Sequence, residues 1–95
     1  MQELNPFQKR VMEALAGIQD SCVQIALYQK NDTSLEEKFY DLTADVIIEI
    51  MKLIDGYADA ELGRLKITCE KTAANLKENP YIELHDTVCN YLKGV

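Results

Sequence analysis

The stretch "FYDLTADVIIEIMKLIDGY", residues 39–57, decides the fold because it contains the strongest helical pattern in the chain. Together with the residues just upstream, its apolar residues recur at steps of three or four, which is the period of one helix face. That stripe consists of Leu35, Phe39, Leu42, Val46, Ile50 and Leu53. Ser34 and Glu37 have the spacing of a capping box, and Gly56 suits a left-handed C-terminal cap. The pattern predicts a helix over residues 35–55.

The C-terminal half of this predicted helix holds more apolar surface than one neighbouring helix needs. At 100° per residue its apolar side chains cover an arc of about 220°, which leaves only Glu49 and Lys52 on the remaining side. The helix is therefore either central in the fold or in contact with a partner. A homodimer would use the four residues Ile47, Ile48, Met51 and Ile54.

A second long helix is predicted before it, from residue 6 to about residue 30. Pro6 suits the first turn of a helix, where its missing amide donor is not needed. Apolar residues then follow one another at helical steps, and only Gln29 interrupts them at the end. The stripe consists of Phe7, Val11, Leu15, Ile18, Cys22 and Ile25.

Residues 57–78 fit two structures. Their apolar residues match a helix capped by Asp59, whereas the stretch "RLKITC" alternates like a strand. We favour the helix, with a small β-hairpin over residues 64–78 as the alternative.

The closing segment predicts another helix, since Asn79 and Pro80 suit its cap and first turn. Its stripe consists of Tyr81, His85, Val88, Cys89 and Leu92. The chain is thus expected to be a single helical domain over residues 1–95. Its fold class is an all-α bundle of three or four helices, or α+β if the hairpin forms.

Composition limits the compartment. The 95 residues contain no apolar run of signal-peptide or membrane-span length. The three cysteines, Cys22, Cys69 and Cys89, are odd in number and show no C-x-x-C spacing. We interpret them as reduced core thiols of a cytoplasmic protein.

Acidic residues concentrate in the middle third of the chain. Residues 31–61 carry nine acids and only two basic residues, within a net charge of −6 for the whole chain. Four acids follow one another at i+4 steps along the central helix, opposite its apolar stripe: Glu37, Asp41, Asp45 and Glu49. A negative field attracts a basic protein and repels nucleic acid and anionic membranes. This acidic stripe is therefore a candidate surface for a basic protein partner, beside its simpler interpretation as a solvated helix face.

The only histidine precedes a cysteine by four residues, which raises the question of a metal site. On a helix, His85 and Cys89 share one face, and a cysteine from another segment would extend the set toward zinc. A structural zinc site usually shows two such local pairs, and this chain has one. A cysteine triad is disfavoured because both side chains lie one turn apart on a single helix. We predict no metal and no cofactor, with His85 hydrogen-bonded to Asp86 or a backbone carbonyl.

Two resemblances bear on function. "SLEEKFYDLTADVIIE" resembles all-α nucleotide pyrophosphohydrolases of the MazG kind in its Glu36-Glu37 pair, which implies Mg2+ held between helices. The second acidic motif of that family has no match in residues 57–78, so the activity is not carried over.

The stretches "FYDLTADVIIEIMKLIDGY" and "IELHDTVCNYL" (82–92) resemble small bacterial proteins that carry no assigned activity. This resemblance implies a bacterial, mostly helical cytosolic domain. On this view Asp55, Gly56, His85 and Asp86 form a structural device. The histidine of the last helix would hydrogen-bond to the end of the central helix.

Three functions follow from these patterns. The favoured one is a small acidic protein-interaction domain, such as an immunity or inhibitor protein that binds a basic partner. The alternative is a metal-dependent nucleotide-processing or ligand-binding domain that uses the acidic stripe or His85. The third is a homodimeric structural protein. The lack of a complete catalytic motif weighs against an enzyme without excluding one.

Overall fold

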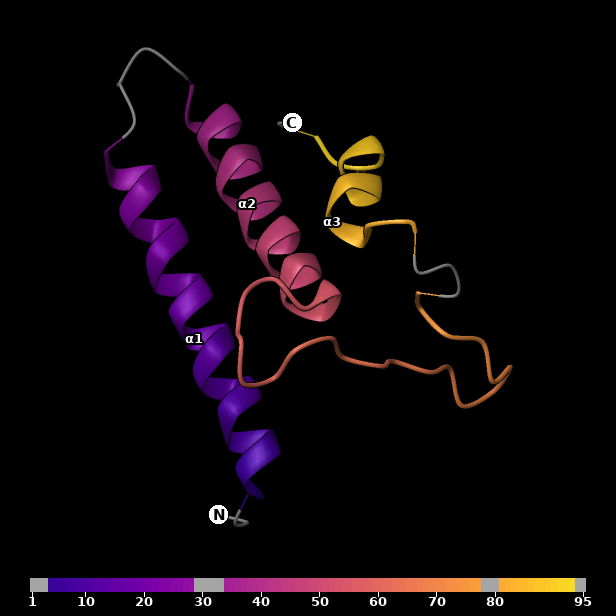
Figure 1. Cartoon of the computed structure of the whole chain (residues 1–95). Coiled ribbons are helices and arrows are strands. Elements are labelled where there is room, and N and C mark those ends of the chain that lie inside the picture. The colour runs from indigo at the N-terminus through magenta and orange to yellow at the C-terminus, as the bar shows by residue number, and fades with distance from the viewer. Residues whose placement is uncertain (1–3, 29–33, 78–80, 94–95) are drawn as a thin grey trace.

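The computed structural model describes residues 4–28, 34–77 and 81–93, and these form three packed helices. The elements are α1 (Pro6–Leu27), α2 (Leu35–Asp55), α3 (Leu84–Thr87) and the 3-10 turn η1 (Val88–Asn90). α2 runs between α1 on one side and α3 on the other (Figure 1). The all-α prediction is confirmed, and the described residues contain no strand.

α1 begins where the sequence predicts, with Pro6 at its first position. Asn5 caps the helix, because its side chain accepts from the Gln8 amide at 2.7 Å while the Gln8 side chain accepts from the Asn5 amide at 2.9 Å. The sequence interpretation missed this capping box. α1 ends at Leu27, slightly before the predicted end, and Gln29 lies outside the described residues.

Both predicted ends of α2 are confirmed. The Ser34 hydroxyl accepts from the Glu37 amide at 3.2 Å. At the other end Gly56 adopts the left-handed conformation (φ +98°), and its amide donates to the carbonyls of Lys52 and Leu53. A Cβ atom at residue 56 would lie 2.9 Å from the Arg64 nitrogen, so this position requires glycine for two reasons.

The core lies between α1 and α2 and is small. Cys22 and Leu53 are almost fully buried, at 1% and 2% exposure, and Ile18 lies beside them. Half-buried residues surround this centre: Ala14, Leu15, Leu42, Val46, Ile50, Leu62 and Leu65. The outer ends of the two predicted stripes are exposed, namely Phe7, Ile25, Leu35 and Phe39. The stripes are therefore covered only where the helices meet the rest of the chain.

The helix favoured over residues 57–78 is wrong for the described residues 57–77. Asp59 does act as a cap, since its side chain accepts from the amides of Glu61 and Leu62 at 2.9 and 3.2 Å. The Gly63 amide then donates to the Asp59 carbonyl, and Gly63 turns left-handed (φ +60°). The helix therefore stops after one turn.

Residues 64–77, which we name the arm, leave the end of α2 and reverse direction away from the helices (Figure 1). The Leu65 amide donates to the Ile54 carbonyl at 3.0 Å, which attaches the arm to α2. Further out, Thr68 and Asn75 form one isolated antiparallel bridge. The β-hairpin alternative therefore predicted the reversal but not its extent, because the pairing is too short to form strands.

The closing helix begins at Leu84, later than predicted, and is only four residues long before η1 continues it. The predicted cap and first turn, Asn79 and Pro80, lie outside the described residues. Among the helices that the structure describes, none is long and apolar enough to cross a membrane.

The cysteines are all free, but they do not share one environment. Cys22 is buried, Cys89 is half-buried and Cys69 is exposed on the arm. The prediction of three core thiols is therefore wrong for Cys69. The reason is structural: the core covers the helices but does not extend to the arm.

The molecule is less compact than is usual for a chain of its length. Its radius of gyration is 15.3 Å, whereas about 12 Å is expected for a compact chain of 95 residues. Its accessible surface is 7431 Å², against about 5,500 Å² for a typical monomeric protein of this mass. Each of the two flanking helices covers one side of α2 and leaves its own outer surface free.

Candidate functional site

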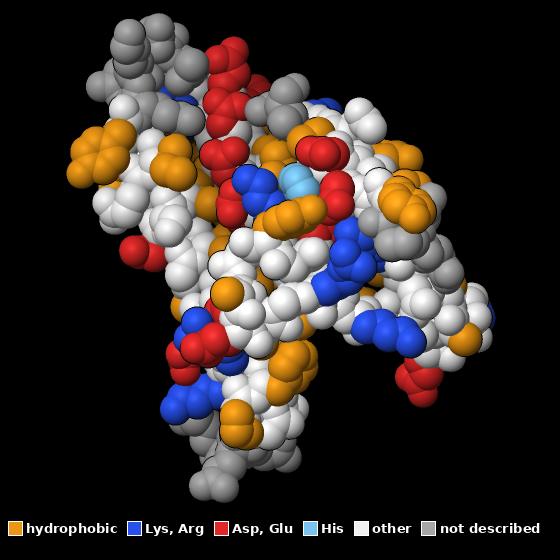
Figure 2. Space-filling view, in the orientation of Figure 1, with side chains coloured by type: hydrophobic (Ala, Val, Ile, Leu, Met, Phe, Trp, Pro, Cys, Tyr) orange, Lys and Arg blue, Asp and Glu red, His pale blue; other side chains and the backbone are white. Residues whose placement is uncertain are grey.

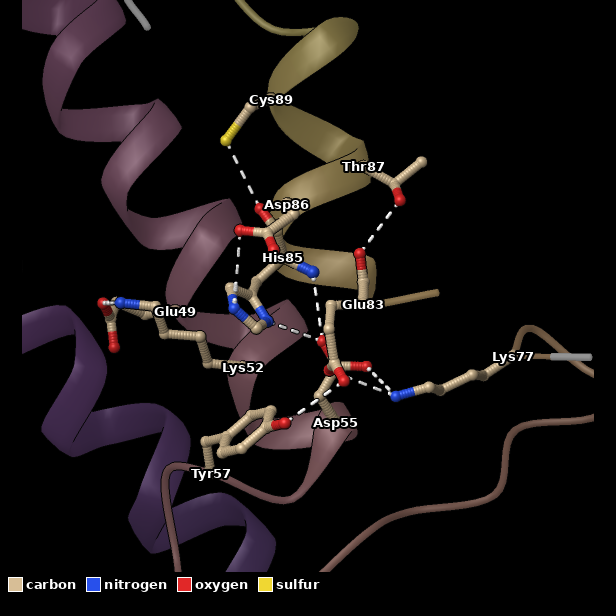
Figure 3. Close-up of polar contacts among 10 residues, drawn as sticks. All are labelled: Glu49, Lys52, Asp55, Tyr57, Lys77, Glu83, His85, Asp86, Thr87 and Cys89. Atoms are coloured by element: carbon tan, nitrogen blue, oxygen red, sulfur yellow. Dashed lines mark hydrogen bonds and ion pairs between the residues drawn. The ribbon is translucent and has the colours of Figure 1, made fainter. Parts of the chain in front are cut away.

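Two features could carry function: a buried polar cluster at the C-terminal end of α2, and a groove between α1 and α2. The polar cluster consists of Asp55, Tyr57, Lys77, Glu83 and His85, and Figure 3 shows how it joins three segments of the chain.

Asp55 is the centre of the polar cluster, and its side chain is 0% exposed. One carboxylate oxygen lies 2.7 Å from His85 Nδ1 and accepts from the His85 amide at 3.1 Å. The other accepts from the Lys77 ammonium at 3.0 Å. The histidine of the last helix thus bonds to the end of α2, which is the structural device that the sequence resemblance implied.

Glu83 and Tyr57 complete the polar cluster. The Lys77 ammonium also donates to Glu83 at 3.3 Å, and the Tyr57 hydroxyl donates to the other Glu83 oxygen at 3.1 Å. The Tyr57 ring meets the His85 ring edge-on, with 5.5 Å between centroids. Sequence analysis missed Tyr57, Lys77 and Glu83, because irregular segments carry them and no periodicity relates them to α2.

The charges of the polar cluster stabilise one another. Burial alone would raise the pKa of Asp55, but hydrogen bonds from His85 and Lys77 outweigh it and hold that pKa below its ordinary value. For Lys77, burial opposes the charged form, and the carboxylates of Asp55 and Glu83 nevertheless raise its pKa. The cluster therefore holds Asp55 and Lys77 in their charged forms.

The polar cluster contains side chains of the types that bind metal ions, but a lysine already lies between its two carboxylates. Among the described residues, Asp55, Glu83 and His85 are the one set of three whose ligand atoms lie within 4.8 Å of one another. The Lys77 ammonium, only 7% exposed, already provides the positive charge between the two carboxylates. This set contains no cysteine. The Cys89 thiol, which the sequence pairs with His85, instead donates to the His85 carbonyl at 3.3 Å.

The Asp55–His85 pair resembles the base and orienting acid of a hydrolase only in part. A carboxylate accepts, so Nδ1 of His85 carries the proton and Nε2 is the free ring nitrogen. Nε2 lies 3.6 Å from Asp86, beyond hydrogen-bond distance, so the predicted bond between these two side chains is not formed. Among the described residues, the His85 ring bonds to Asp55 and approaches Asp86, so the arrangement links segments of the chain.

The second feature, which we name the acidic groove, is a hollow of about 550 Å³ between α1 and α2. Small and apolar side chains form most of it, and carboxylates stand at its side. Its lining residues are Ala14, Gly17, Ile18, Ser21, Cys22, Ile25, Asp45, Glu49, Leu53, Ala58 and Asp59. Figure 2 shows acidic side chains in a row between the two helices.

The acidic groove brings together part of the predicted acidic stripe. Glu37 is exposed, whereas Asp41, Asp45 and Glu49 are half-buried, and the last two line the groove. The expectation that the stripe lies opposite the apolar face is therefore wrong at its C-terminal end. Each i+4 step turns by about 40°, so the stripe rotates by about 120° toward α1 between Glu37 and Glu49.

Asp45 is the least favourably placed acid in the groove. Burial raises its pKa, and the neighbouring charges of Asp41 and Glu49 raise it further. Glu49 pairs with Lys52 at 3.0 Å. Asp45 forms no ion pair among the residues that the structure describes, although the nearby charge of Lys52 opposes part of the rise in its pKa. The groove therefore holds a carboxylate that an additional positive charge would stabilise.

Another acid that lines the groove, Asp59, is already paired. Arg10 of α1 binds Asp59 at 2.9 Å, and Glu61 lies 3.5 Å from the same guanidinium nitrogen. Asp59 is thus already neutralised, unlike Asp45. The carboxylate of the groove that forms no ion pair with a described residue is therefore Asp45, on α2.

The four candidate dimer residues are largely used within the chain. Ile54 is 6% exposed and carries the attachment point of the arm, so it does not belong to a free face. Ile47, Ile48 and Met51 are half-buried. The dimer face therefore stays a prediction for Ile47, Ile48 and Met51.

A comparison with models of protein families, with curated proteins and with solved structures found no match for this chain.

Proposed function

We propose that the chain is a protein-interaction domain whose acidic groove binds a basic, partly apolar segment of another polypeptide. The observation that carries this proposal is Asp45, which is half-buried in the groove beside two other acids and forms no ion pair with a described residue. A lysine or arginine from outside would offset the burial and the like-charge repulsion together.

The lining of the groove suits a basic, partly apolar segment. Ala14, Gly17 and Ser21 are small and lie on one face of α1, which allows close approach of a backbone. Ile25 is exposed and supplies apolar contact, whereas Ile18 and Leu53 are buried and form the floor of the groove. A segment with lysines beside apolar side chains matches both properties, and an amphipathic helix is one such segment.

The surface of the molecule agrees with a binding role. Its accessible surface exceeds the value typical of its mass, and the excess is large enough for a partner to cover. A second apolar hollow of about 520 Å³ lies on the first half of α2, lined by Leu35, Glu36, Phe39, Tyr40 and Thr43. An immunity or inhibitor protein that covers a basic enzyme is one form of this function.

The metal-dependent alternative has weaker support. The acids of the acidic stripe follow one helix and do not converge, whereas the convergent set Asp55, Glu83 and His85 already holds the Lys77 ammonium between its two carboxylates. Mg2+ requires several oxygen ligands around one point. The geometry favours recognition by the groove over catalysis.

A defined peptide tests the proposal. A helical peptide with alternating lysine and leucine faces is titrated into the labelled protein, with a glutamate-for-lysine peptide as the specificity control. The basic peptide should shift amide signals of groove residues and bind at least tenfold more weakly to the Asp45→Asn/Glu49→Gln variant.

The matched control variant is Glu13→Gln/Asp20→Asn, which removes the same charge from exposed residues of α1 outside the groove. It should bind like the wild type. Equal affinity of both double variants, or signal shifts away from the groove, would contradict the proposal. Circular dichroism of each variant verifies that the helices remain.

A further inference from the structure

The arm has the chemistry that the acidic groove requires. Residues 64–77 contain four basic residues and one acid, and Lys77 is held in the polar cluster. The other three, Arg64, Lys66 and Lys71, are exposed. The arm also exposes apolar side chains, Ile67 at 45% and Leu76 at 47%. It is therefore a basic and partly apolar segment on an otherwise acidic protein.

The arm cannot serve the groove of its own chain. Figure 1 shows the arm extending from the end of α2 away from α1, whereas the groove lies between α1 and α2. Figure 2 shows the acidic row of the groove and the basic side chains over the arm on one face of the molecule. The acidic row and the basic side chains thus face the same way, with the region around His85 between them.

This layout is self-complementary. When a second copy is turned by a two-fold axis that lies in the plane of this face, between groove and arm, each arm is brought over the groove of the other copy. Both contacts are then identical, which is the requirement for a closed two-fold dimer. An arm and a groove on opposite faces would instead build an open chain of molecules.

We infer that the partner of the acidic groove is a second copy of this chain, which places its arm across the groove so that Lys66 and Lys71 face Asp45 and Glu49. The inference rests on the proposed function, because it uses the same groove and names its occupant. It also gives a role to the arm, which Leu65 and Lys77 attach to the end of α2.

The size of the uncovered surface agrees with a dimer. The chain exposes roughly 1,900 Å² more than a typical monomer of its mass. A stable interface takes about 800 Å² from each partner. The net charge of −6 repels a second copy at long range, but at physiological salt this repulsion is screened beyond about 8 Å. Opposite charges in direct contact then decide the orientation.

Sedimentation equilibrium and light scattering at physiological salt test the inference. The wild type should change from monomer to dimer as its concentration rises through the micromolar range. The arm variant Lys66→Glu/Lys71→Glu and the groove variant Asp45→Lys/Glu49→Lys should each dimerise at least tenfold more weakly. Because Asp45 is half-buried, the milder Asp45→Asn/Glu49→Gln variant accompanies them. Lys9→Glu/Lys93→Glu, the same charge change off the arm, should dimerise like the wild type.

Mixing the two charge-reversed variants is the decisive step. In a mixed dimer one contact is the native pair and the other is the fully reversed pair, so both contacts are attractive. The mixture should therefore form a heterodimer that neither variant forms with itself. A mixture that stays monomeric would overturn the inference, as would a wild-type dimer that survives both reversals.

The inference and the proposed function fail in different ways. If the wild type is monomeric at every concentration but its groove binds the lysine peptide, only the second copy is excluded as the partner. If the peptide does not bind and the dimer is insensitive to both reversals, the groove itself is excluded. Competition between the peptide and dimer formation would support both.

Discussion

His85 Nδ1 lies 2.7 Å from the Asp55 carboxylate, although thirty residues separate the two in the sequence. The other oxygen of that carboxylate accepts from Lys77 at the base of the arm. One buried side chain at the end of α2 therefore fixes both the arm and α3. This explains how a chain with so small a core holds two segments that contain little regular structure.

The first prediction concerns this carboxylate. Asp55→Ala should lower the free energy of unfolding by about 3 to 5 kcal/mol, because it leaves buried partners of an ion pair without their anion. Urea denaturation followed by circular dichroism measures the change. Asp86→Ala, at a side chain that is 79% exposed, should change stability by less than about 0.5 kcal/mol. Equal effects of the two substitutions would contradict a central role for Asp55.

The second prediction concerns acid. The pKa of Asp55 in the folded chain lies below its ordinary value of 3.8, since hydrogen bonds from His85 and Lys77 outweigh the cost of burial. The stability that this shift contributes is fully present above pH 3.8 and is lost as the pH falls through the lower, folded value. Asp55→Asn should therefore be less stable at neutral pH but should lose less on acidification. Thermal unfolding between pH 7 and pH 2 tests this, and parallel losses in both proteins would count against it.

The third prediction concerns the turn at the end of α2. Gly56→Ala should lower the free energy of unfolding by about 2 kcal/mol or more, since alanine is disfavoured at φ +98° and its Cβ would meet Arg64. Gly17→Ala is the control, because a Cβ atom there meets nothing within 4 Å. Glycine is unfavourable inside a helix, so Gly17→Ala should be neutral or stabilising by up to about 1 kcal/mol.

The sequence predicts the parts of the fold that local patterns determine. α1 and α2 have long apolar stripes and recognisable caps, such as Ser34 and Gly56, and both helices begin where expected. For the segment after α2, the cap and the apolar pattern did not predict the same structure. Its cap at Asp59 is real, but Gly63 ends the helix after one turn, and no periodic pattern distinguishes a capped helix from a capped turn.

In the candidate sites, too, the sequence predicts what local patterns determine and misses what only the folded chain brings together. The bond between His85 and the end of α2 was suggested by a resemblance, whereas its partners Lys77 and Glu83 lie on irregular segments that only the folded chain brings together. The four acids of the stripe were found from their spacing. Their orientation was not, because the slow rotation of an i+4 series places Glu37 in solvent and Glu49 in a groove.

The fourth prediction concerns the thiols. Cys69 is exposed, and hydrogen bonds from the Thr72 hydroxyl and from the amides of Thr72 and Lys71 lower its pKa. Burial raises the pKa of Cys22, and the charges of Asp45 and Glu49 raise it further. A thiol reagent should therefore modify Cys69 rapidly in the native protein and Cys22 only after unfolding. Mass spectrometry of partly labelled protein identifies the site, and early labelling of Cys22 would contradict the packing of α1 on α2.

The last prediction separates stability from binding at Asp45. The pKa of this carboxyl is raised in the folded chain, by burial first and then by Asp41 and Glu49, so at neutral pH its charge destabilises the fold. Asp45→Asn should raise the free energy of unfolding of the isolated chain by about 0.5 to 1 kcal/mol, the scale of two like-charge pairs on a helix. The gain should shrink as the pH falls through the folded pKa, where the wild-type carboxyl becomes neutral.

The same substitution should weaken binding of the lysine peptide several-fold, because the groove loses the charge that a partner would neutralise. Opposite signs in the two measurements are expected of a residue kept for recognition at a cost in stability. Asp20→Asn, on an exposed face of α1, should alter neither quantity. A variant that is both less stable and unchanged in binding would show that Asp45 serves the fold and not the groove.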